Sequence, residues 1–241
     1  KAEGLNMIFE SLSINVKTSG ANKDYDAKLV TYIPDMSVDS IPPRDAVVIC
    51  PGGGYHFLSE REAEPIALEF AARGICAFVL YYSVSPAIYP QAVCEAAEAV
   101  KIVRDNAKKW NINPNKIAIC GFSAGGHLAA SLGVFYHTRD VLENLNCTED
   151  EVKPNAMILS YPVISSGEKA HRGSFTNLLG ERYDELLEYT SLENRVTEKA
   201  PPAFIWHTIT DTAVPVENSI YMFTALKNAG VNAEMHIFPN G

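Results

Sequence analysis

The sequence has no apolar run long enough to cross a membrane and no excess of basic residues. Its longest uninterrupted apolar stretch covers residues 75–82, whereas a membrane-spanning helix needs about 20 such residues. The formal charge is -9, from 29 acidic and 20 basic residues, which leaves no basic footprint for a phosphate backbone or an anionic lipid surface. We therefore expect a protein that binds neither nucleic acid nor membranes.

Cysteine is scarce, and metal-binding patterns are missing. The five cysteines form no C-x-x-C pair, and no H-E-x-x-H segment occurs, which disfavours a zinc site and a disulfide framework. No repeat or Ser/Gly-rich linker divides the 241 residues, so we expect a single globular domain. The N-terminal residues contain no apolar segment like that of a signal peptide. These features favour a cytoplasmic location.

Short apolar runs alternate with amphipathic stretches along most of the chain. Six runs are predicted to be strands, at 46–50, 75–81, 116–120, 156–161, 203–207 and 233–238. Four stretches are predicted to be helices, at about 60–73, 90–109, 124–137 and 216–229. Continuous apolar strands separated by helices indicate a mostly parallel sheet with helices on both faces. The predicted fold is three-layer α/β.

Two stretches stand outside this alternation. Residues 5–16 and 27–33 flank a polar turn, and this predicts an N-terminal hairpin. Residues 165–200 are polar, rich in Glu and weakly periodic. They follow the carboxyl end of a predicted strand, at the edge where α/β folds bind ligands, so they are a candidate cap or pocket wall. A plain surface excursion is the alternative.

The strongest functional motif is the G-x-S-x-G segment centred on Ser123, with Gly121 and Gly125 at its ends. It lies between a predicted strand and a predicted helix. The motif needs small residues because the sharp turn strains the serine backbone and larger side chains would collide. Ser123 is therefore the predicted nucleophile at the carboxyl edge of the sheet. A glycine-rich helix start that merely eases packing is the alternative.

A second motif is the segment PGGGY at 51–55. Acyl transfer needs two backbone N–H donors where the oxyanion develops. One donor follows the nucleophile, here Ala124, and the other comes from an earlier loop, here Gly53 or Gly54. A dinucleotide-binding turn is the rival interpretation, but Phe57 stands where the third glycine of G-x-G-x-x-G is required.

A third candidate is Asp211, just beyond the predicted strand at 203–207. The order Ser then Asp, at the carboxyl edge of the sheet, is the order of a hydrolase triad in which the acid orients an imidazole. An Asp before Thr can also simply close a turn. Glu217 is the nearest substitute acid, but it falls in a predicted helix that would carry it off the edge.

These motifs resemble those of α/β-hydrolase fold carboxylesterases, in particular the bacterial acetyl esterase and acetyl-xylan esterase branch related to hormone-sensitive lipase. The resemblance extends from about residue 45 to the end and rests on CPGGGYHFLS, GFSAGGHLAA, PPAFIWHTITDTAVPVENS and MHIFPNG. It implies an α/β-hydrolase fold and a serine esterase that needs no metal or organic cofactor. Pro51 stands where lipase-like members carry the His of His-Gly-Gly-Gly, as on the carbohydrate-esterase side.

The resemblance also implies a short-acyl ester substrate, in particular acetylated sugars or xylo-oligosaccharides. Tyr55 and His56 on the glycine-rich loop are candidate pocket residues. Aromatic residues near strand ends are candidates for stacking on a sugar, although such residues more often belong to the core; they are Tyr55, Tyr81, Tyr82, Tyr89 and Trp206. The sequence leaves open the acyl length and whether the protein forms a homo-oligomer.

The triad histidine is the main departure from the family pattern. Family members carry it in a loop after the last strand and then add a final helix, whereas this sequence stops at Gly241. The six histidines are His56, His127, His137, His171, His207 and His236. His236 and His207 fall in predicted strands and His127 in a predicted helix, so each is predicted to be packed rather than to act as the base. We expect the base and the last helix beyond residue 241, and residues 1–241 alone to be nearly inactive.

Two alternative functions remain open. A peptidase of the same fold would use the same triad, but such enzymes usually carry a propeller or a large cap domain, for which 241 residues leave no room. A non-catalytic protein of this fold would bind a ligand or a partner. The presence of Ser123, Asp211 and the glycine-rich loop together argues against it.

Overall fold

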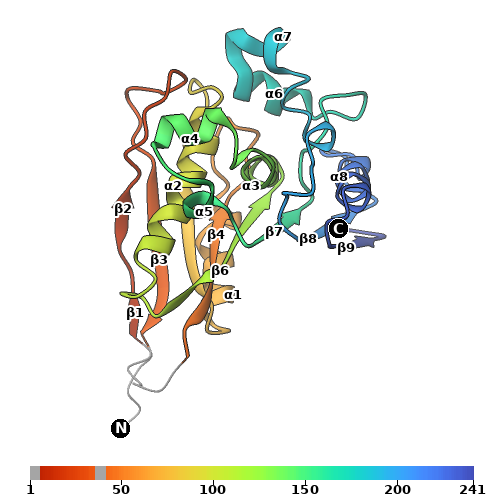
Figure 1. Ribbon diagram of the computed structural model, residues 1–241. Coiled ribbons are helices and arrows are strands. Elements are labelled where there is room, and N and C mark those ends of the chain that lie inside the picture. The colour runs from red at the N-terminus through yellow and green to blue at the C-terminus, as the bar shows by residue number, and fades with distance from the viewer. Residues whose placement is uncertain (1–5, 36–41) are drawn as a thin grey trace.

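The computed structural model describes residues 6–35 and 42–241, and within them a nine-stranded sheet runs through the protein (Figure 1). The strands are β1 (Asn6–Ile8), β2 (Ser11–Ser13), β3 (Lys28–Asp35), β4 (Arg44–Cys50), β5 (Cys76–Tyr81), β6 (Ile112–Phe122), β7 (Ala156–Ser160), β8 (Ala203–Thr208) and β9 (Ala233–Phe238). Their order is β1-β3-β5-β4-β6-β7-β8-β9, with β2 also paired to β3. Strands β4 to β9 run parallel to their neighbours among themselves, which confirms the predicted mostly parallel sheet.

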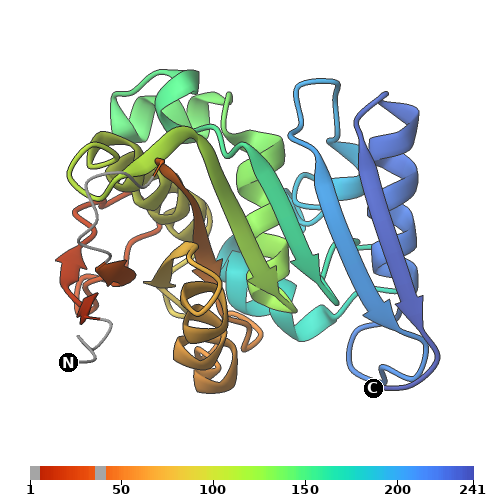
Figure 2. The same ribbon diagram turned by 90° about the horizontal axis from the view of Figure 1, so that it is seen from below.

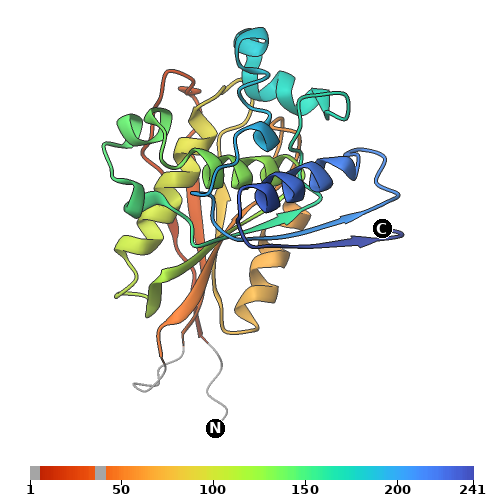
Figure 3. The same cartoon turned by 45° about the vertical axis from the view of Figure 1, so that its right-hand side comes forward.

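Helices cover both faces of this sheet. The helices of the described chain are α1 (Glu64–Ala71), α2 (Gln91–Asp105), α3 (Ala124–Phe135), α4 (Arg139–Leu145), α5 (Glu149–Val152), α6 (Arg172–Leu179), α7 (Tyr183–Leu186) and α8 (Glu217–Asn228), and the 3-10 helices are η1 (Glu60–Glu62), η2 (Gly180–Arg182) and η3 (Leu192–Asn194). On one face lie α2, α3 and α8, and on the other lies α1, against β3, β4 and β5 (Figure 2 and Figure 3). This arrangement confirms the three-layer α/β architecture. Within the described part of the chain, no helix is long and apolar enough to span a bilayer.

The N-terminal hairpin is present, with its first strand broken in two. Both β1 and β2 pair antiparallel with β3. At the break, the N–H of Glu10 donates to the Thr31 hydroxyl, and the Thr31 N–H donates to the Glu10 carbonyl, each at 2.9 Å. Residue 5 of the predicted first strand lies outside the described residues.

Alternating side chains along the central strands create a core on each face of the sheet. On β4, Val48 and Cys50 belong to the core under α2 and α3, whereas Val47 and Ile49 belong to the core under α1. All four are at most 1% exposed. A strand that is buried on both faces has a continuous apolar sequence, and this is why the run at 46–50 could be recognised.

The four predicted helices are all present, and the stretch 60–73 is interrupted. The 3-10 helix η1 ends at Glu62, and α1 begins at Glu64 with a proline in its first turn, where the missing N–H of proline costs nothing. The helices α4 to α7 were not predicted, because short helices carry little periodicity and depend on tertiary contacts. One such contact on α4 is the hydrogen bond from the Tyr89 hydroxyl to Asp140, at 2.8 Å.

The face that carries α1 is less covered near β8 and β9. Phe204 on β8 is 38% exposed and Phe238 on β9 is 49% exposed. The Phe204 ring lies 5.5 Å from that of His236, and the Trp206 ring lies 6.4 Å from that of Phe238, measured between ring centroids. A row of aromatic rings therefore crosses these two strands at the surface.

Candidate active site

Ser123 lies at the turn from β6 into α3, at the carboxyl edge of the sheet. Its backbone angles are φ 52° and ψ -117°, a conformation that a serine adopts only under strain. Its N–H donates to the Ser160 carbonyl, and its own carbonyl accepts the N–H of Val163, both at 3.0 Å. The chain at the end of β7 therefore holds this turn from both sides. The geometry is the strained strand-to-helix turn that the G-x-S-x-G motif predicts.

Two glycines allow this turn to form because a Cβ atom would not fit at either position. A Cβ on Gly121 would lie 2.0 Å from the carbonyl oxygen of Gly125. A Cβ on Gly125 would lie 2.1 Å from the carbonyl oxygen of Cys50, at the end of β4. These atoms belong to the backbone and cannot swing away, so the predicted collision of larger side chains is confirmed.

The glycine-rich loop after β4 lies beside Ser123. A Cβ on Gly52 would be only 3.1 Å from the Ser123 Cβ. Gly53 and Gly54 have φ angles of 130° and 66°, which favour glycine. Among the described residues, no hydrogen bond uses the N–H of either glycine as donor. The N–H of Ala124 lies in the first turn of α3, where amides have no partner inside the helix. Unpaired amides from two elements thus flank Ser123.

Tyr55, on the same loop, is buried in the core. It is 2% exposed, and its hydroxyl lies 2.9 Å from Nδ1 of His127. Its ring packs edge-on against those of Tyr82 and His127. This corrects the expectation that Tyr55 lines a substrate pocket, because a ring enclosed in this way offers no face to a ligand. The next residue, His56, is exposed and stays a candidate pocket residue.

The other aromatic residues considered for sugar stacking divide between core and surface. Tyr82 is 0% exposed and Tyr89 is 4% exposed, so both belong to the core. Tyr81 and Trp206 are half-buried. Only these last two retain ring surface that a ligand can reach.

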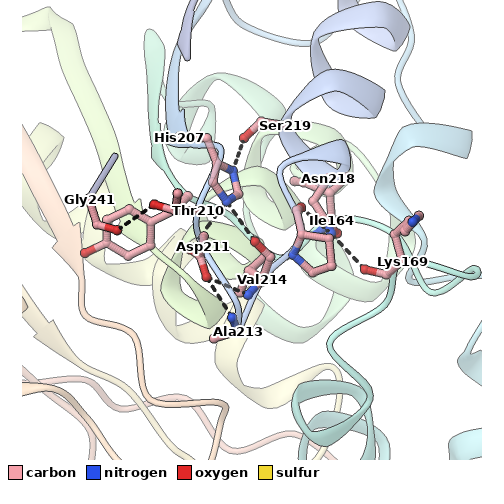
Figure 4. A network of polar contacts seen from close by, with 12 residues as sticks. Ile164, Lys169, His207, Thr210, Asp211, Ala213, Val214, Asn218, Ser219 and Gly241 are labelled. Carbon is pink, nitrogen blue, oxygen red and sulfur yellow. Dashed lines mark hydrogen bonds and ion pairs between the residues drawn. The ribbon is translucent and has the colours of Figure 1, made fainter. Parts of the chain in front are cut away.

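Asp211 lies in the turn after β8, and β7 separates its strand from the strand that leads to Ser123. Two strand spacings correspond to about 10 Å across the sheet. Its Oδ1 accepts the N–H groups of Ala213 at 2.8 Å and Val214 at 2.9 Å (Figure 4). The residue thus closes a turn, as the alternative interpretation held, and the same bonds fix the direction of its carboxylate.

His207 is a buried partner of this turn. Its Nε2 donates to the Val214 carbonyl at 2.9 Å and lies 3.4 Å from Oδ2 of Asp211, while its Nδ1 accepts the Ser219 hydroxyl at 2.8 Å (Figure 4). Burial lowers the pKa of His207, in opposition to its bond to Val214 and the charge of Asp211. With both ring nitrogens engaged, His207 is the packed histidine that its place in a strand predicts.

A cavity of about 410 Å³ borders Asp211. Its lining residues are Arg61, Glu62, Tyr161, Trp206, Thr208, Thr210, Asp211, Thr212 and Gly241. The cavity therefore contains a second carboxylate, that of Glu62. The sequence did not single out Glu62, because it is one of several acidic residues in a charged stretch and belongs to no spaced motif.

The remaining histidines have other surroundings. His236 on β9 bonds to Glu234 at 2.6 Å. His171, just before α6, bonds through Nδ1 to the Ser174 hydroxyl at 2.8 Å. Across residues 6–35 and 42–241, no histidine forms a hydrogen bond with the side chain of Ser123.

The segment 165–200 packs against the glycine-rich loop. Asn177 on α6 donates its side-chain N–H to the Gly54 carbonyl at 2.8 Å. A Cβ on Gly54 would lie 3.9 Å from the Ser174 hydroxyl and 4.0 Å from the His171 ring. Two helices of this segment, α6 and α7, project at the top of Figure 1. The segment therefore borders the loop that flanks Ser123.

Asn218 fastens the start of this segment to α8. Its Oδ1 accepts the N–H groups of Ile164 and Ser165, both at 2.9 Å, and its Nδ2 donates to the carbonyls of Lys169 at 2.9 Å and Pro215 at 3.0 Å (Figure 4). The side chain is fully buried and makes four hydrogen bonds. Sequence reasoning missed this residue, since an Asn near a helix start is ordinary.

Comparison with known proteins relates this geometry to a family. Residues 31–226 match the BD-FAE family, and this range contains the glycine-rich loop, Ser123 and Asp211. The chain belongs to the BD-FAE family of α/β-hydrolases. The predicted resemblance to α/β-hydrolase fold esterases is thereby confirmed.

Similar proteins include two curated relatives and one solved structure. Acetylxylan esterase from Xylanibacter ruminicola is 35% identical over 98% of this chain and 47% of its own length. Endo-1,4-beta-xylanase B from Butyrivibrio fibrisolvens is 42% identical over 82% of this chain and 32% of its own length. The crystal structure of an acetyl ester-xyloside bifunctional hydrolase from Caldicellulosiruptor lactoaceticus is 39% identical, with a TM-score of 0.82 over 96% of this chain and 86% of that chain. The chain thus spans less than half the length of these two curated relatives.

In this BD-FAE family protein, motifs located part of the site and tertiary contacts supply the rest. Ser123 and the glycine-rich loop were predicted from their motifs, and Asp211 from its place after a predicted strand. The structure brings all three to one edge of the sheet. Glu62 and Asn177 were missed, because each is recognisable only by its hydrogen bond to the loop and neither belongs to a pattern of fixed spacing.

Proposed function

We propose that this BD-FAE family protein is a serine carboxylic ester hydrolase that works through an acyl-enzyme. The strained turn at Ser123, next to the unpaired amides of the glycine-rich loop, is the observation that carries the proposal. Glycine would adopt φ 52° without strain, so a serine there indicates a chemical role. The names of two similar proteins, acetylxylan esterase and acetyl ester-xyloside bifunctional hydrolase, support the same reaction class.

In the proposed reaction, Ser123 Oγ attacks the ester carbonyl carbon and gives its proton to a neutral imidazole. The carbonyl oxygen becomes an oxyanion, which the N–H groups of Ala124 and of Gly53 or Gly54 stabilise. The bond from carbon to the alcohol oxygen then breaks, the imidazolium protonates the leaving alcohol, and the acyl group remains on Ser123. Water then attacks the acyl carbon and gives a proton to the imidazole. The bond from this carbon to Ser123 Oγ breaks, and the imidazolium returns the proton to Oγ as the acid is released.

Asp211 is the proposed acid that orients this imidazole. Two backbone N–H groups fix its Oδ1, and the residue borders the 410 Å³ cavity. The family resemblance places the base on a histidine after the last strand of the sheet. Among the described residues, no histidine forms a hydrogen bond with the side chain of Ser123, which supports this placement.

The proposed substrates are short-acyl esters, in particular acetylated sugars or xylo-oligosaccharides. The names of the similar acetylxylan esterase and acetyl ester-xyloside hydrolase support an acetyl group and a xylan-type alcohol. The segment 165–200 is the proposed pocket wall, since Asn177 holds it against Gly54. The half-buried His171, a polar group of this segment near the loop, suits an alcohol that carries hydroxyl groups.

We also place the enzyme in the cytoplasm. All five cysteines are free thiols, and four of them are buried, which fits a reducing compartment. Fractionation of native cells with an antibody against this protein tests the location, and recovery of the protein outside the cytoplasm would contradict it.

The first experiment is hydrolysis of p-nitrophenyl acetate and p-nitrophenyl octanoate by the full-length natural protein. The acetate ester should be cleaved faster than the octanoate. Ser123→Ala should abolish this activity, as well as labelling by a fluorophosphonate probe. Ser131→Ala, on the same helix α3, is the matched control and should retain both.

Each outcome bears on one part of the proposal. Acetate hydrolysis that depends on Ser123 directs the next assay to acetylated xylo-oligosaccharides. Equal turnover by the wild-type protein and Ser123→Ala would contradict the esterase proposal and favour a non-catalytic binding protein of this fold. Faster hydrolysis of the octanoate would overturn only the short-acyl preference.

A further inference from the structure

Glu62 links the glycine-rich loop to the end of β7. The residue is half-buried at the end of η1. Its Oε2 accepts the N–H of Gly52 at 2.7 Å, and its Oε1 accepts the hydroxyl of Tyr161 at 2.9 Å. Among the described residues, no ion pair includes Glu62. One carboxylate therefore joins two segments through one backbone and one side-chain donor.

The loop end of this link lies against the nucleophile. A Cβ on Gly52 would be 2.7 Å from Oε2 of Glu62 and 3.1 Å from the Ser123 Cβ. The carbonyl of Gly52 also accepts the N–H of Ser59 at 2.9 Å. Both polar groups of Gly52 are thus held by residues 59–62, and the next two residues are Gly53 and Gly54, whose N–H groups are the proposed oxyanion donors.

The other end of the link is a fixed support. Tyr161 directly follows β7 with φ 37°, and its N–H donates to the Trp206 carbonyl at 2.8 Å. Its ring packs edge-on against the Trp206 ring, at 5.0 Å between centroids, and lies tilted against the Phe122 ring, at 5.9 Å. Burial, with the nearby charge of Glu62, raises the pKa of Tyr161. The hydroxyl therefore stays protonated and donates a hydrogen bond to Glu62.

We infer that Glu62 is a positioning residue for the oxyanion donors: its carboxylate holds the glycine-rich loop at a set distance from Ser123 by connecting it to Tyr161. The inference rests on the proposed esterase function and adds to it a residue that contacts no reacting atom. If the link is lost, the loop gains freedom at Gly53 and Gly54, whose glycine backbone offers little resistance. Donors that move lose much of their effect, because oxyanion stabilisation depends on preorganised geometry.

The chemistry of a carboxylate suits this link. An ionised Glu has two acceptor oxygens and no donor, so it can accept from an N–H and an O–H at once. Gln has one acceptor oxygen and one NH2 donor. If the oxygen accepts the N–H of Gly52, the NH2 faces the Tyr161 hydroxyl, whose hydrogen must then point elsewhere. Ala loses both bonds. We therefore expect the order of damage Glu62→Ala, then Glu62→Gln, with Tyr161→Phe the mildest because it keeps the bond to Gly52.

The test compares these three variants with wild-type full-length protein in hydrolysis of p-nitrophenyl acetate. We expect kcat for Glu62→Ala to fall by about 10- to 100-fold, with KM within about threefold, since the bonds at stake act on the transition state. Inhibition by a trifluoromethyl ketone, whose adduct on Ser123 carries an oxyanion, should weaken by a similar factor. Glu60→Ala, on the exposed side of the same 3-10 helix, is the matched control and should match wild type in both.

A purely structural role would give a different result. A structural role would lower the melting temperature and the fraction of sites that a fluorophosphonate labels. The kcat per labelled site and the inhibition constant of the ketone would stay at wild-type values. That pattern would overturn the inference. If Glu62→Ala does not fold, Glu62→Gln and Tyr161→Phe decide, since both keep the volume of the side chain. Absence of Ser123-dependent hydrolysis in wild type would instead refute the esterase proposal itself.

Discussion

The buried His127 makes the stability of the protein depend on pH. It is 1% exposed on α3. Its Nε2 bonds to the Thr190 carbonyl at 3.0 Å, and its Nδ1 bonds to the Tyr55 hydroxyl at 2.9 Å. A carbonyl can only accept, so Nε2 carries the proton and Nδ1 accepts from Tyr55. The ring is therefore neutral, and a second proton would place a charge in the core.

The size of the effect follows from the pKa of His127. Burial lowers this pKa from its usual 6.5 to about 4, in spite of the bond to Thr190. The two values differ by about 2.5, which corresponds to about 3 kcal/mol of unfolding free energy. The unfolded chain binds the proton more readily, so this stability is fully present above pH 6.5 and is lost as the pH falls from 6.5 to 4.

The assay is urea unfolding of wild type and His127→Gln at several pH values from 7.5 to 4. We expect the variant to be less stable than wild type at pH 7.5 and the difference between them to shrink by about 3 kcal/mol at pH 4. Leu128→Ala is the matched control, because it removes a neighbouring buried side chain without a titratable group and costs about 2–5 kcal/mol at every pH. Parallel curves for wild type and His127→Gln would refute the reasoning.

Three further predictions concern stability. Gly125→Ala would place a Cβ 2.1 Å from a backbone oxygen and should lower the free energy of unfolding by more than about 3 kcal/mol. The control Gly173→Ala, whose Cβ would have its nearest neighbour at 3.6 Å, should leave that free energy unchanged or raise it by up to about 1 kcal/mol. Melting temperatures check both variants. Asn218→Ala removes four buried hydrogen bonds and should lower the free energy of unfolding by about 2–4 kcal/mol. The control Asn228→Ala, at an exposed position, should lower it by less than about 0.5 kcal/mol. A similarly small loss for Asn218→Ala would show that water replaces the bonds of Asn218. Burial raises the pKa of Glu95 above its usual 4.5, so the folded protein binds the Glu95 proton more tightly than the unfolded chain does. Wild type should therefore lose stability relative to Glu95→Gln as the pH rises from 4.5. The same difference in unfolding free energy at pH 4.5 and 7.5 would contradict this.

The sequence determined the features that depend on neighbouring residues. A strand that is buried on both faces must be apolar at every position, so the run at 46–50 identified a central strand without any knowledge of the strand order. The turn at Ser123 was also recognisable from nearby residues, because the carbonyl that excludes a Cβ at Gly121 belongs to Gly125, only four residues away.

Tertiary structure decided the features that join distant segments. Tyr55 was expected at a pocket, but it lies in the core because α3 places His127 where the Tyr55 hydroxyl can reach it. Glu62 meets Gly52 and Tyr161, and the last of these is 99 residues away along the chain. Such contacts depend on how the crossovers arrange β4, β6 and β7 side by side. A single Glu, Asn or Tyr has no periodicity or spacing that records its partner, so only the assembled sheet shows which of these side chains hold the loop beside Ser123.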